Sequence, residues 1–456
     1  MYKKSIFIFR RSLRISDNMG LLKALKLSKK VVPIFIFTPE QILKNSYKSD
    51  NAVQFMVESL SELDKELKKK DSKLFYFFGK PHEVVKDLIK NNKIEAVFAN
   101  VDYTPYSISR DKKICKVCEE YNVDFKSYED LLLNPIGSFL TGSNTPFKKY
   151  TPYYNKAKKN KIKPTAKNRY KNYISNNYRI KNEFKGNIGS FYKKNNKAAV
   201  KGGRKNALLI LKKMKKFKDY DKKRNILIYE TTKLSAYIKF GCVSIREVCH
   251  VINKSINSKD LIKQLYWRDF YYNIAFFFPH VFGHAMKEKY DKISWPNKKS
   301  LFEKWKKGKT GFPIVDACMR QLNETGFMHN RGRLITSNFL IKILLIDWKK
   351  GEQYFAQKLI DYDPSVNNGN WQWSSSTGAD SQPYFRIFNP WLQSKKFDSA
   401  CEYIKKWVPE LREVNNADIQ KWHEKCSKYK EIDYPKPIVD YAQIRKKSMA
   451  LYKKYT

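Results

Sequence analysis

The stretch that decides the fold is residues 367–390, NNGNWQWSSSTGADSQPYFRIFNP. Two acids, Asp361 and Asp363, stand just before it, and its opening Asn-Asn-Gly tripeptide predicts a turn. Two tryptophans, Trp371 and Trp373, then alternate. Acids two residues apart bind a metal or anchor a sugar hydroxyl, and no neighbouring His or Cys completes a metal-ligand set here. The stretch therefore favours a ligand that carries hydroxyl groups over a metal ion.

Tryptophan divides the chain of 456 residues into two parts. All nine tryptophans lie at position 267 or later, so the two parts have different kinds of core. From about residue 220 to 452 the apolar pattern is helical. The first third alternates short β-branched and aromatic runs with helix-like segments, which is typical of a parallel sheet covered on both faces. We expect strands at Ser5–Phe9, Val31–Phe37, Lys73–Phe78 and Ile94–Ala99, and helices near Met19–Lys29, Ala52–Lys69, Pro81–Lys90 and Ser107–Tyr121.

The region between these parts, residues 140–219, is rich in Lys, Asn, Gly and Tyr and has weak periodicity, which indicates a long connection. The sequence therefore predicts an α/β plus all-α protein. A doubly wound parallel sheet domain takes residues 1–135, a linker residues 136–219 and a helical domain residues 220–456. No G-x-G-x-x-G follows the first strand, so a dinucleotide fingerprint is missing there.

Basic residues outnumber acids by 91 to 44, which gives a formal charge of +47. This balance favours a polyanionic partner, because Lys and Arg neutralise phosphates and release counterions. The alternative is drift toward AT-rich codons, which does not explain why acids are half as frequent as bases. Segment 328–336, MHNRGRLIT, sets two arginines beside an amide, which suits a phosphate or an aromatic cofactor. A solvated basic face fits the same residues.

No apolar stretch is long enough to span a bilayer, and the run MYKKSIFIFRR at the start is too short for a signal peptide. The seven cysteines are scattered and odd in number, which indicates reduced thiols in a cytosolic setting. Cys115 and Cys118 form one isolated pair, so we expect structural thiols rather than zinc.

A helix is predicted at residues 261–272, LIKQLYWRDFYY. One face of this helix is formed by Gln264 and by the residues three, four and seven positions after it, which are Trp267, Arg268 and Tyr271. That face carries an amide, a large ring and a cation. The same pattern also fits a buried helix with a single ion pair.

Four segments, in this order and spacing, resemble the DNA photolyase/cryptochrome family. They are RRSLRISDN at 10–18, TGFPIVDACMRQLNETGFMHNRGR at 310–333, the stretch at 367–390 and YPKPIVD at 434–440. The resemblance runs over nearly the whole chain, is weakest across residues 140–219, and is closest to the class I photolyases that repair cyclobutane pyrimidine dimers.

This resemblance implies an α/β domain joined to a helical domain that holds FAD. Blue or near-UV light then excites reduced FAD, which passes an electron to a cyclobutane pyrimidine dimer in single- or double-stranded DNA. The dimer must leave the base stack to reach the flavin, and photolyases are among the enzymes known for such base flipping. We expect a monomer that acts on damaged DNA without a membrane partner, in the cytoplasm or with access to the nucleoid or nucleus.

The resemblance also implies a set of cofactor contacts. Lys233 replaces the usual Arg and keeps its charge, Arg333 and Asp361 form an ion pair beside the isoalloxazine, and Asn367 faces the flavin N5. The positions expected to bind FAD phosphates are Tyr220, Thr231, Thr232, Lys233, Leu234 and Ser235. Those expected to line the flavin and adenine are Arg268, Asn330, Arg333, Asp361, Tyr362, Asp363 and Asn367.

Further positions match the family's DNA contacts and its tryptophan relay. Trp267 and Trp373 correspond to the rings that flank the flipped dimer. Trp371, Trp348 and Trp295 correspond to a relay that runs from the flavin to the surface, although buried tryptophans are also ordinary core residues. The expected DNA-binding residues are Gln264, Trp267, Tyr271, Asn330, Arg331, Trp373 and Gln393.

The chain departs from the family pattern at several positions. Gln264 stands where dimer-repairing members usually carry Glu, so the acidic proton of that residue is missing. The (6-4) photolyases also use Gln there, but they need His at the position of Asn330. The sequence Asn-Arg-Gly-Arg at 330–333 is similar to that of the DASH cryptochromes. The residues on either side of it, His329 and Leu334, differ from the residues that those cryptochromes carry there.

A cryptochrome-like blue-light sensor is the alternative function. Sensors of the plant type have a long tail, whereas this chain ends soon after Asp440, and they often carry Asp in place of Asn367. Both features favour repair. For a second, antenna chromophore, residues 102–107 lack the Asn-Glu pair of the folate-binding type, so we expect no folate at that site. A deazaflavin, a second flavin or no antenna all remain open.

Overall fold

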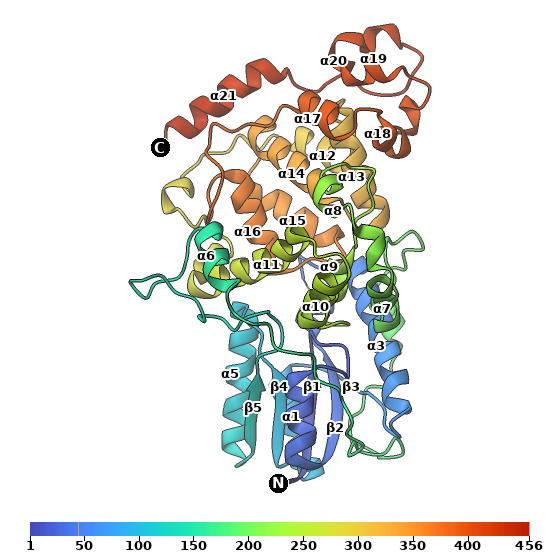
Figure 1. Ribbon diagram of the computed structural model, residues 1–456, viewed down its shortest axis with the longest axis vertical. Coiled ribbons are helices and arrows are strands. Elements are labelled where there is room, and N and C mark those ends of the chain that lie inside the picture. The colour runs from blue at the N-terminus through green and yellow to red at the C-terminus, as the bar shows by residue number, and fades with distance from the viewer. Residues whose placement is uncertain (44, 456) are drawn as a thin grey trace. The chain divides into compact units, whose positions relative to one another are not determined.

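The computed structural model describes residues 1–43 and 45–455 and divides them into two compact units (Figure 1). Unit 1 comprises Met1–Lys194, Val200–Lys218 and Thr232–Pro279. Unit 2 comprises Asn195–Ala199, Asp219–Thr231 and the chain from His280 onward. This division by contacts differs from the expected boundaries at residues 135 and 219, because most of the expected linker and the segment before His280 pack with the sheet.

Unit 1 is built on a five-stranded sheet in the order β3-β2-β1-β4-β5. Its strand pairs are parallel, with Ile6 opposite Val32 on one side and Val97 on the other. The predicted doubly wound sheet is therefore confirmed. The last strand was not predicted, since its sequence DFKSY is polar and partly exposed, as suits a sheet edge. The strands are β1 Tyr2–Phe9, β2 Ser28–Phe37, β3 Phe75–Phe78, β4 Ala96–Asn100 and β5 Asp124–Tyr128.

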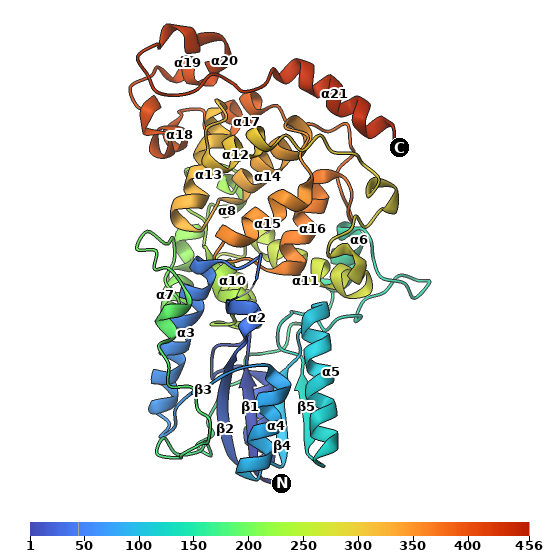
Figure 2. The ribbon, with the colours of Figure 1, turned by 180° about the vertical axis from the view of Figure 1, so that it is seen from behind.

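Helices cover both faces of this sheet. Helix α1 lies in front of it in Figure 1 and α4 in front of it in Figure 2. The side chain of Asn18 caps α1 by accepting a hydrogen bond from Leu21 N, and α1 ends at Leu27 because residues 28–29, expected as helix, belong to β2. The helices are α1 Met19–Leu27, α2 Pro39–Ile42, α3 Asp50–Lys68, α4 Pro81–Asn92 and α5 Pro105–Glu120.

The segment RRSLRISDN serves mainly to hold unit 1 together. Arg14 is buried, donates to Asp130 at 2.7 Å and to the carbonyl oxygen of Gly241 at 3.0 Å, and Arg246 pairs with both Asp130 and Asp17. Each buried charge thus has an opposite charge and hydrogen bonds, without which its burial would be costly. The network ties the loop after β1 to the helices that follow residue 232. The helices after residue 232 are α9 Leu234–Lys239, α10 Ile245–Ser255 and α11 Lys259–Phe277, and unit 1 also contains α6 Tyr150–Ala157 and α7 Arg204–Lys212.

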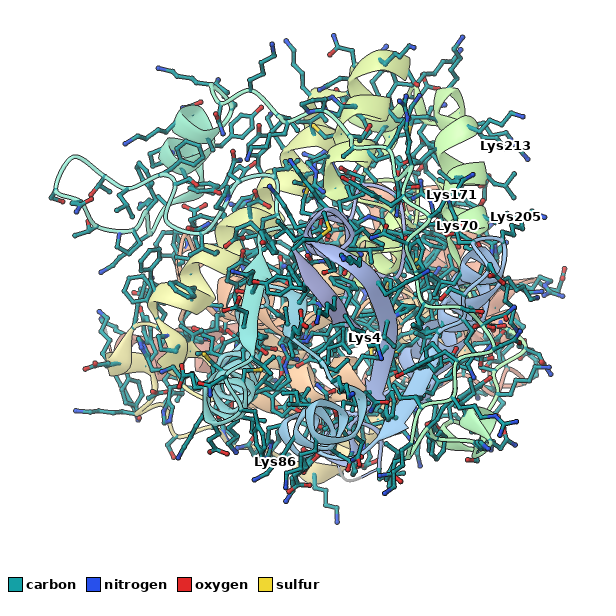
Figure 3. The ribbon with its side chains drawn as sticks, turned by 90° about the horizontal axis from the view of Figure 1, so that it is seen from below. Lys4, Lys70, Lys86, Lys171, Lys205 and Lys213 are labelled. Carbon is teal, nitrogen blue, oxygen red and sulfur yellow. The ribbon has the colours of Figure 1, made fainter. Side chains whose placement is uncertain are left out.

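Positive charge is spread over unit 1. Figure 3 labels six lysines that come from a strand (Lys4), helices (Lys86 and Lys205) and turns or loops (Lys70, Lys171 and Lys213). In the described residues, no helix is both long enough and apolar enough to cross a bilayer.

Unit 2 is helical, as predicted. Its core contains the buried tryptophans Trp305, Trp348, Trp371 and Trp422. A π-helical turn at Phe339–Ile343 follows α14. The helices are α8 Tyr220–Lys223, α12 Lys299–Lys307, α13 Pro313–Thr325, α14 Asn330–Asn338, α15 Trp348–Lys358, α16 Pro364–Ser375, α17 Pro390–Phe397, α18 Glu402–Trp407, α19 Asn416–Gln420, α20 Trp422–Lys425 and α21 Tyr441–Lys453.

Candidate active site

The predicted site residues are divided between the two units, and each set is described within its own unit. Unit 1 carries Thr232, Lys233, Leu234, Ser235, Gln264, Trp267, Arg268 and Tyr271. Unit 2 carries Tyr220, Thr231, Trp295, Asn330, Arg331, Arg333, Trp348, Asp361, Tyr362, Asp363, Asn367, Trp371, Trp373 and Gln393.

In unit 1, the expected phosphate-binding run leads into α9. Lys233 adopts a left-handed conformation (φ 52°) and is the N-cap residue of that helix. Thr232 is buried, and its hydroxyl accepts a hydrogen bond from Leu234 N at 3.4 Å. Short hydroxyl side chains thus lie at a helix start, as the sequence predicted, and such groups suit a phosphate.

The predicted helix at 261–272 is part of α11, whose first turn is capped by Ser258. Gln264 Nε2 donates to the carbonyl oxygen of Asp260 at 3.1 Å, and Arg268 Nη1 donates to that of Leu131 at 2.7 Å. Trp267 is partly exposed and contacts the buried Tyr271. The side chains of this face are therefore held in place by the backbone and by neighbouring rings.

One important residue of α11 lies outside the predicted set. Asp269 is fully buried and accepts hydrogen bonds from the backbone N–H groups of Leu133 and Asn134. Burial raises the pKa of its carboxyl group to about 7, although the neighbouring Arg268 and these hydrogen bonds oppose the shift. Asp269 thus fixes α11 against the segment at 131–134, and a lone Asp in an aromatic run gave no sign of this role.

In unit 2, α14 brings Arg333 to Asp361. Arg333 Nη2 lies 3.1 Å from Asp361 Oδ1 and 2.9 Å from Oδ2, and Arg333 Nε donates to the carbonyl oxygen of Met328. The carboxylate is almost buried and the guanidinium is about a quarter exposed, at 4% and 26%. The predicted ion pair is therefore formed, with one side of the guanidinium accessible.

His329 caps α14, because its Nδ1 accepts a hydrogen bond from Arg331 N at 3.1 Å. Burial first, and then the charges of Arg331 and Arg333, lower the pKa of His329 to about 4. Below the ordinary pKa of 6.5, the imidazole of His329 is protonated in the unfolded chain but stays neutral in the folded protein. The contribution of His329 to the free energy of unfolding is therefore complete above pH 6.5 and is lost as the pH drops toward 4.

We accordingly expect the free energy of unfolding to fall by about 2 kcal/mol between pH 7.5 and pH 5 through this one group. The variant His329→Asn keeps a capping acceptor and does not titrate in this range, so it should lack this part of the pH dependence. Urea unfolding at the two pH values measures the difference. An identical pH dependence in the two proteins would contradict this assignment.

Asn367 lies on α16, a helix that begins at the N-cap Asp363 with Pro364 at its first position. The turn predicted from Asn-Asn-Gly is therefore wrong. The cap and the burial of Asn368 and Trp371 outweigh the local preference, and Asn368 Nδ2 instead donates to the carbonyl oxygen of Val281 at 2.8 Å.

Glu352 on α15 orients Asn367 and was missed from the sequence. Asn367 Nδ2 donates to Glu352 Oε1 at 2.9 Å and to the Glu352 carbonyl oxygen at 3.3 Å. Because these donor contacts go to one residue, the amide is held with its oxygen available to a donor such as a ring N–H. Tyr362 also donates to Glu352 Oε1, at 3.4 Å.

The three tryptophans expected to form the relay differ in their exposure. Trp371 and Trp348 are buried, at 2% and 3% exposed, whereas Trp295 is partly exposed. Trp371 meets Phe355 edge to face with the ring centroids 4.9 Å apart, and Trp305 at 6.4 Å. Trp295 packs against Tyr452 at 5.9 Å. All three belong to the aromatic core of unit 2 or pack against it.

Three arginines of unit 2 crowd together. Burial, and then the charges of Arg224 and Arg386, lower the pKa of Arg331 to about 10. Arg331 Nη2 donates to Asn225 Oδ1 at 2.7 Å, and its guanidinium lies over the ring of Phe397 at 4.3 Å. In the described part of the chain, its Nε is buried and finds no hydrogen-bond partner. This arginine cluster (Arg224, Arg331 and Arg386) is thus suited to a polyanion.

A second basic cluster lies in unit 1, just beyond the carboxyl ends of β1 and β4. These two strands flank the point where the strand order reverses, which is where ligands bind in doubly wound sheets. Arg10 and Arg110 both pair with Asp111 at 2.9 Å. Burial and the charge of Arg110 lower the pKa of Arg10 to about 10. Among the described residues, Nη2 of each arginine is buried and has no hydrogen-bond partner.

Comparison with known proteins places the chain in a family. Residues 5–169 match the DNA photolyase family model, and residues 261–454 match the FAD binding domain of DNA photolyase. The deoxyribodipyrimidine photo-lyase of Buchnera aphidicola subsp. Acyrthosiphon pisum is 37% identical over 99% of this chain and 97% of its own length.

Two solved structures are similar over almost their full length. An archaeal photolyase from Sulfolobus tokodaii, which contains two FAD molecules, is 41% identical with a TM-score of 0.89, over 99% of this chain and 100% of that one. A cryptochrome from Synechocystis is 26% identical with a TM-score of 0.89, over 99% of each chain. Sequence and fold therefore agree, and the chain belongs to the DNA photolyase family.

Proposed function

We propose that the protein is a deoxyribodipyrimidine photo-lyase, which uses light and bound FAD to split cyclobutane pyrimidine dimers in DNA. The observation that carries this proposal is helix α16. It holds the oriented amide of Asn367, the buried indole of Trp371 and the partly exposed indole of Trp373 on one rigid element. A cofactor contact, an electron relay and a lesion contact need fixed positions relative to one another, and a single helix provides them.

The residues of unit 2 fit a flavin. The amide oxygen of Asn367 suits a ring N–H donor, and the Arg333–Asp361 pair presents a partly exposed cation whose charge is already balanced. In unit 1, Thr232, Lys233 and Ser235 suit the phosphates. Bound reduced FAD supplies the electron for dimer splitting when it absorbs blue or near-UV light.

The protein's own residues bind and orient the reactants. Trp267 of unit 1 and Trp373 of unit 2 each contact the flipped dimer, and Gln264 hydrogen-bonds a pyrimidine base. Trp371, Trp348 and Trp295 would relay electrons inward from an external reductant, such as a thiol, and would so allow bound oxidised flavin to be reduced. Blue-light splitting of dimers by the pre-reduced protein tests this proposal, whereas flavin binding without splitting would favour the light sensor.

The arginine cluster supports contact with the DNA backbone. Replacing Arg331 by Ala should weaken binding equally to damaged and undamaged DNA, and reduce the slope of log K against log salt by about 1. The variant Arg331→Lys keeps the charge and should keep that slope. Titration of labelled oligonucleotides at several salt concentrations measures both. An unchanged slope in Arg331→Ala would rule out a phosphate contact at this residue.

Gln264 gives a test of the lesion contact. Changing it to Glu introduces an acidic proton donor, so we expect the number of dimers split per absorbed photon to rise. The substitution also removes the hydrogen bond from Gln264 Nε2 to Asp260, which leaves the side chain less tied to its own helix. Quantum yields measured on pre-reduced protein compare the two forms. An equal yield would show that Gln at position 264 does not lower the quantum yield of dimer splitting.

A second chromophore fits the basic cluster of unit 1. The unpaired nitrogens of Arg10 and Arg110 suit an anionic group, and Tyr106 beside Arg110 offers a ring that is 40% exposed. Since the Sulfolobus tokodaii photolyase contains two FAD molecules, we favour a flavin over folate. Two flavins per chain in purified protein, falling to one in Arg110→Ala, support this site. One flavin per chain in both proteins would contradict it.

The protein acts as a monomer on single- or double-stranded DNA, wherever the cell's DNA is accessible. Sedimentation with dimer-containing oligonucleotides of each kind tests this part of the proposal. One protein per lesion is expected on both.

A further inference from the structure

Tyr150 of α6 stacks face to face on Trp267 of α11, and both residues belong to unit 1. Their ring centroids are 3.7 Å apart and their planes differ by 7°. Helix α6 lies beside α11 in Figures 1 and 2. This is the tightest ring pair around Trp267, because Phe270 and Tyr271 of its own helix lie at 5.6 and 5.4 Å.

Tyr150 is itself held from several sides. It is 6% exposed, and its hydroxyl donates to the carbonyl oxygen of Lys263 at 2.9 Å, so its ring is tied to the backbone of α11 one turn before Trp267. Phe270 meets it edge to face at 5.9 Å, and Tyr154 stacks against it at 5.7 Å. The ring that covers Trp267 is thus fixed by hydrogen bonding and by packing.

The stack limits what Trp267 can do. A partly exposed indole on a helix normally has more than one staggered rotamer available. Here one face of the ring is covered by Tyr150, so a base can meet only the other face or the edge of the indole. Rotation of the indole would break the stack and expose Tyr150. The indole is therefore presented in one orientation before any ligand arrives, which lowers the entropic cost of binding.

We propose that Tyr150 is a positioning residue for lesion recognition, which holds the Trp267 indole in the orientation that receives a flipped pyrimidine dimer. This inference rests on the proposed role of Trp267. It gives a task in recognition to residues 136–219, which the sequence suggested were only a connection.

Three substitutions separate this role from a structural one. Tyr150→Ala removes the stack, Tyr150→Leu removes it but retains apolar volume, and Tyr150→Phe keeps the ring while losing the hydrogen bond to Lys263. Each protein is tested with FAD bound, on a thymine-dimer oligonucleotide and on its undamaged counterpart.

We expect Tyr150→Ala and Tyr150→Leu to weaken binding of the dimer oligonucleotide about tenfold, the size of one lost aromatic stacking contact. KM for splitting should rise by the same factor, whereas kcat, FAD content and affinity for undamaged DNA stay unchanged. Tyr150→Phe should restore most of the loss. Tyr150→Leu keeps the test valid if the Ala variant does not fold.

The variant Trp267→Ala distinguishes failure of this inference from failure of the proposed function. If it loses dimer recognition while Tyr150→Leu keeps it, the role of Tyr150 is wrong and that of Trp267 stands. If Trp267→Ala also keeps recognition, the lesion contact proposed for α11 is wrong. A Tyr150→Leu protein that loses FAD, or that binds both DNAs equally poorly, would show a structural role and overturn the inference.

Discussion

The variant Trp371→Phe is expected to lose most of the light-driven reduction of its bound oxidised flavin while it still repairs dimers when reduced chemically beforehand. Indole can lose one electron without losing a proton at the same time, and phenylalanine cannot replace it as an electron donor. The expected first donor sits in the core of unit 2, where Phe355 and Trp305 surround it. Absorbance bleaching under blue light with an added reductant measures the reduction rate.

The matched control is Trp305→Phe. Trp305 is equally buried and belongs to the same core, but it lies outside the proposed relay. Its loss removes a hydrogen bond from Nε1 to the Thr336 carbonyl oxygen, so some loss of stability is expected without loss of photoreduction. Equal bleaching of wild type and Trp371→Phe would exclude Trp371 from the relay. Equal slowing in both variants would point to a general effect of the core.

Replacing Gly351 by Ala is expected to destabilise the protein and to disturb Trp371. A Cβ at this position would lie closer than 3.0 Å to ring carbons of Trp371 and to Leu340 Cδ2. Alanine is the better helix former by about 1 kcal/mol, so the overlap must outweigh a gain. Since crowding of a packed core costs about 1–3 kcal/mol, we expect a net loss and slower photoreduction.

Denaturant unfolding and flavin bleaching measure these two effects of Gly351→Ala. Gly142→Ala is the control, because a Cβ added at Gly142 would meet open space, with no contact within 4 Å. A Gly351→Ala protein as stable as wild type, with unchanged photoreduction, would show that Trp371 is free to shift and that its position matters little.

The sequence predicted elements best where one physical signal dominated. Four strands were found because their residues are mostly apolar, either β-branched or aromatic, and the Arg333–Asp361 pair followed from the family motif. The edge strand at 124–128 was missed because Asp, Lys and Ser make up three of its five residues. The Asn-Asn-Gly turn was wrong because the Asp363 cap and tertiary burial outweigh local preference.

Residues that orient or surround a predicted site residue could not be predicted from the sequence. Glu352 is fifteen positions from Asn367, and Tyr150 lies more than a hundred positions from Trp267 in a segment without clear periodicity. Arg224 and Arg386 likewise reach Arg331 only through the fold. Such partners are set by the packing of distant helices, which neither composition nor spacing specifies.

The central claim, that this chain repairs cyclobutane pyrimidine dimers with light, is tested most directly by one measurement. Pre-reduced protein is illuminated with blue light in the presence of oligonucleotides that carry either a thymine dimer or a (6-4) product, with dark samples alongside. We predict light-dependent restoration of the thymine dimer and no change in the (6-4) product. Flavin-loaded protein that restores neither lesion, or restores the (6-4) product alone, would contradict the account.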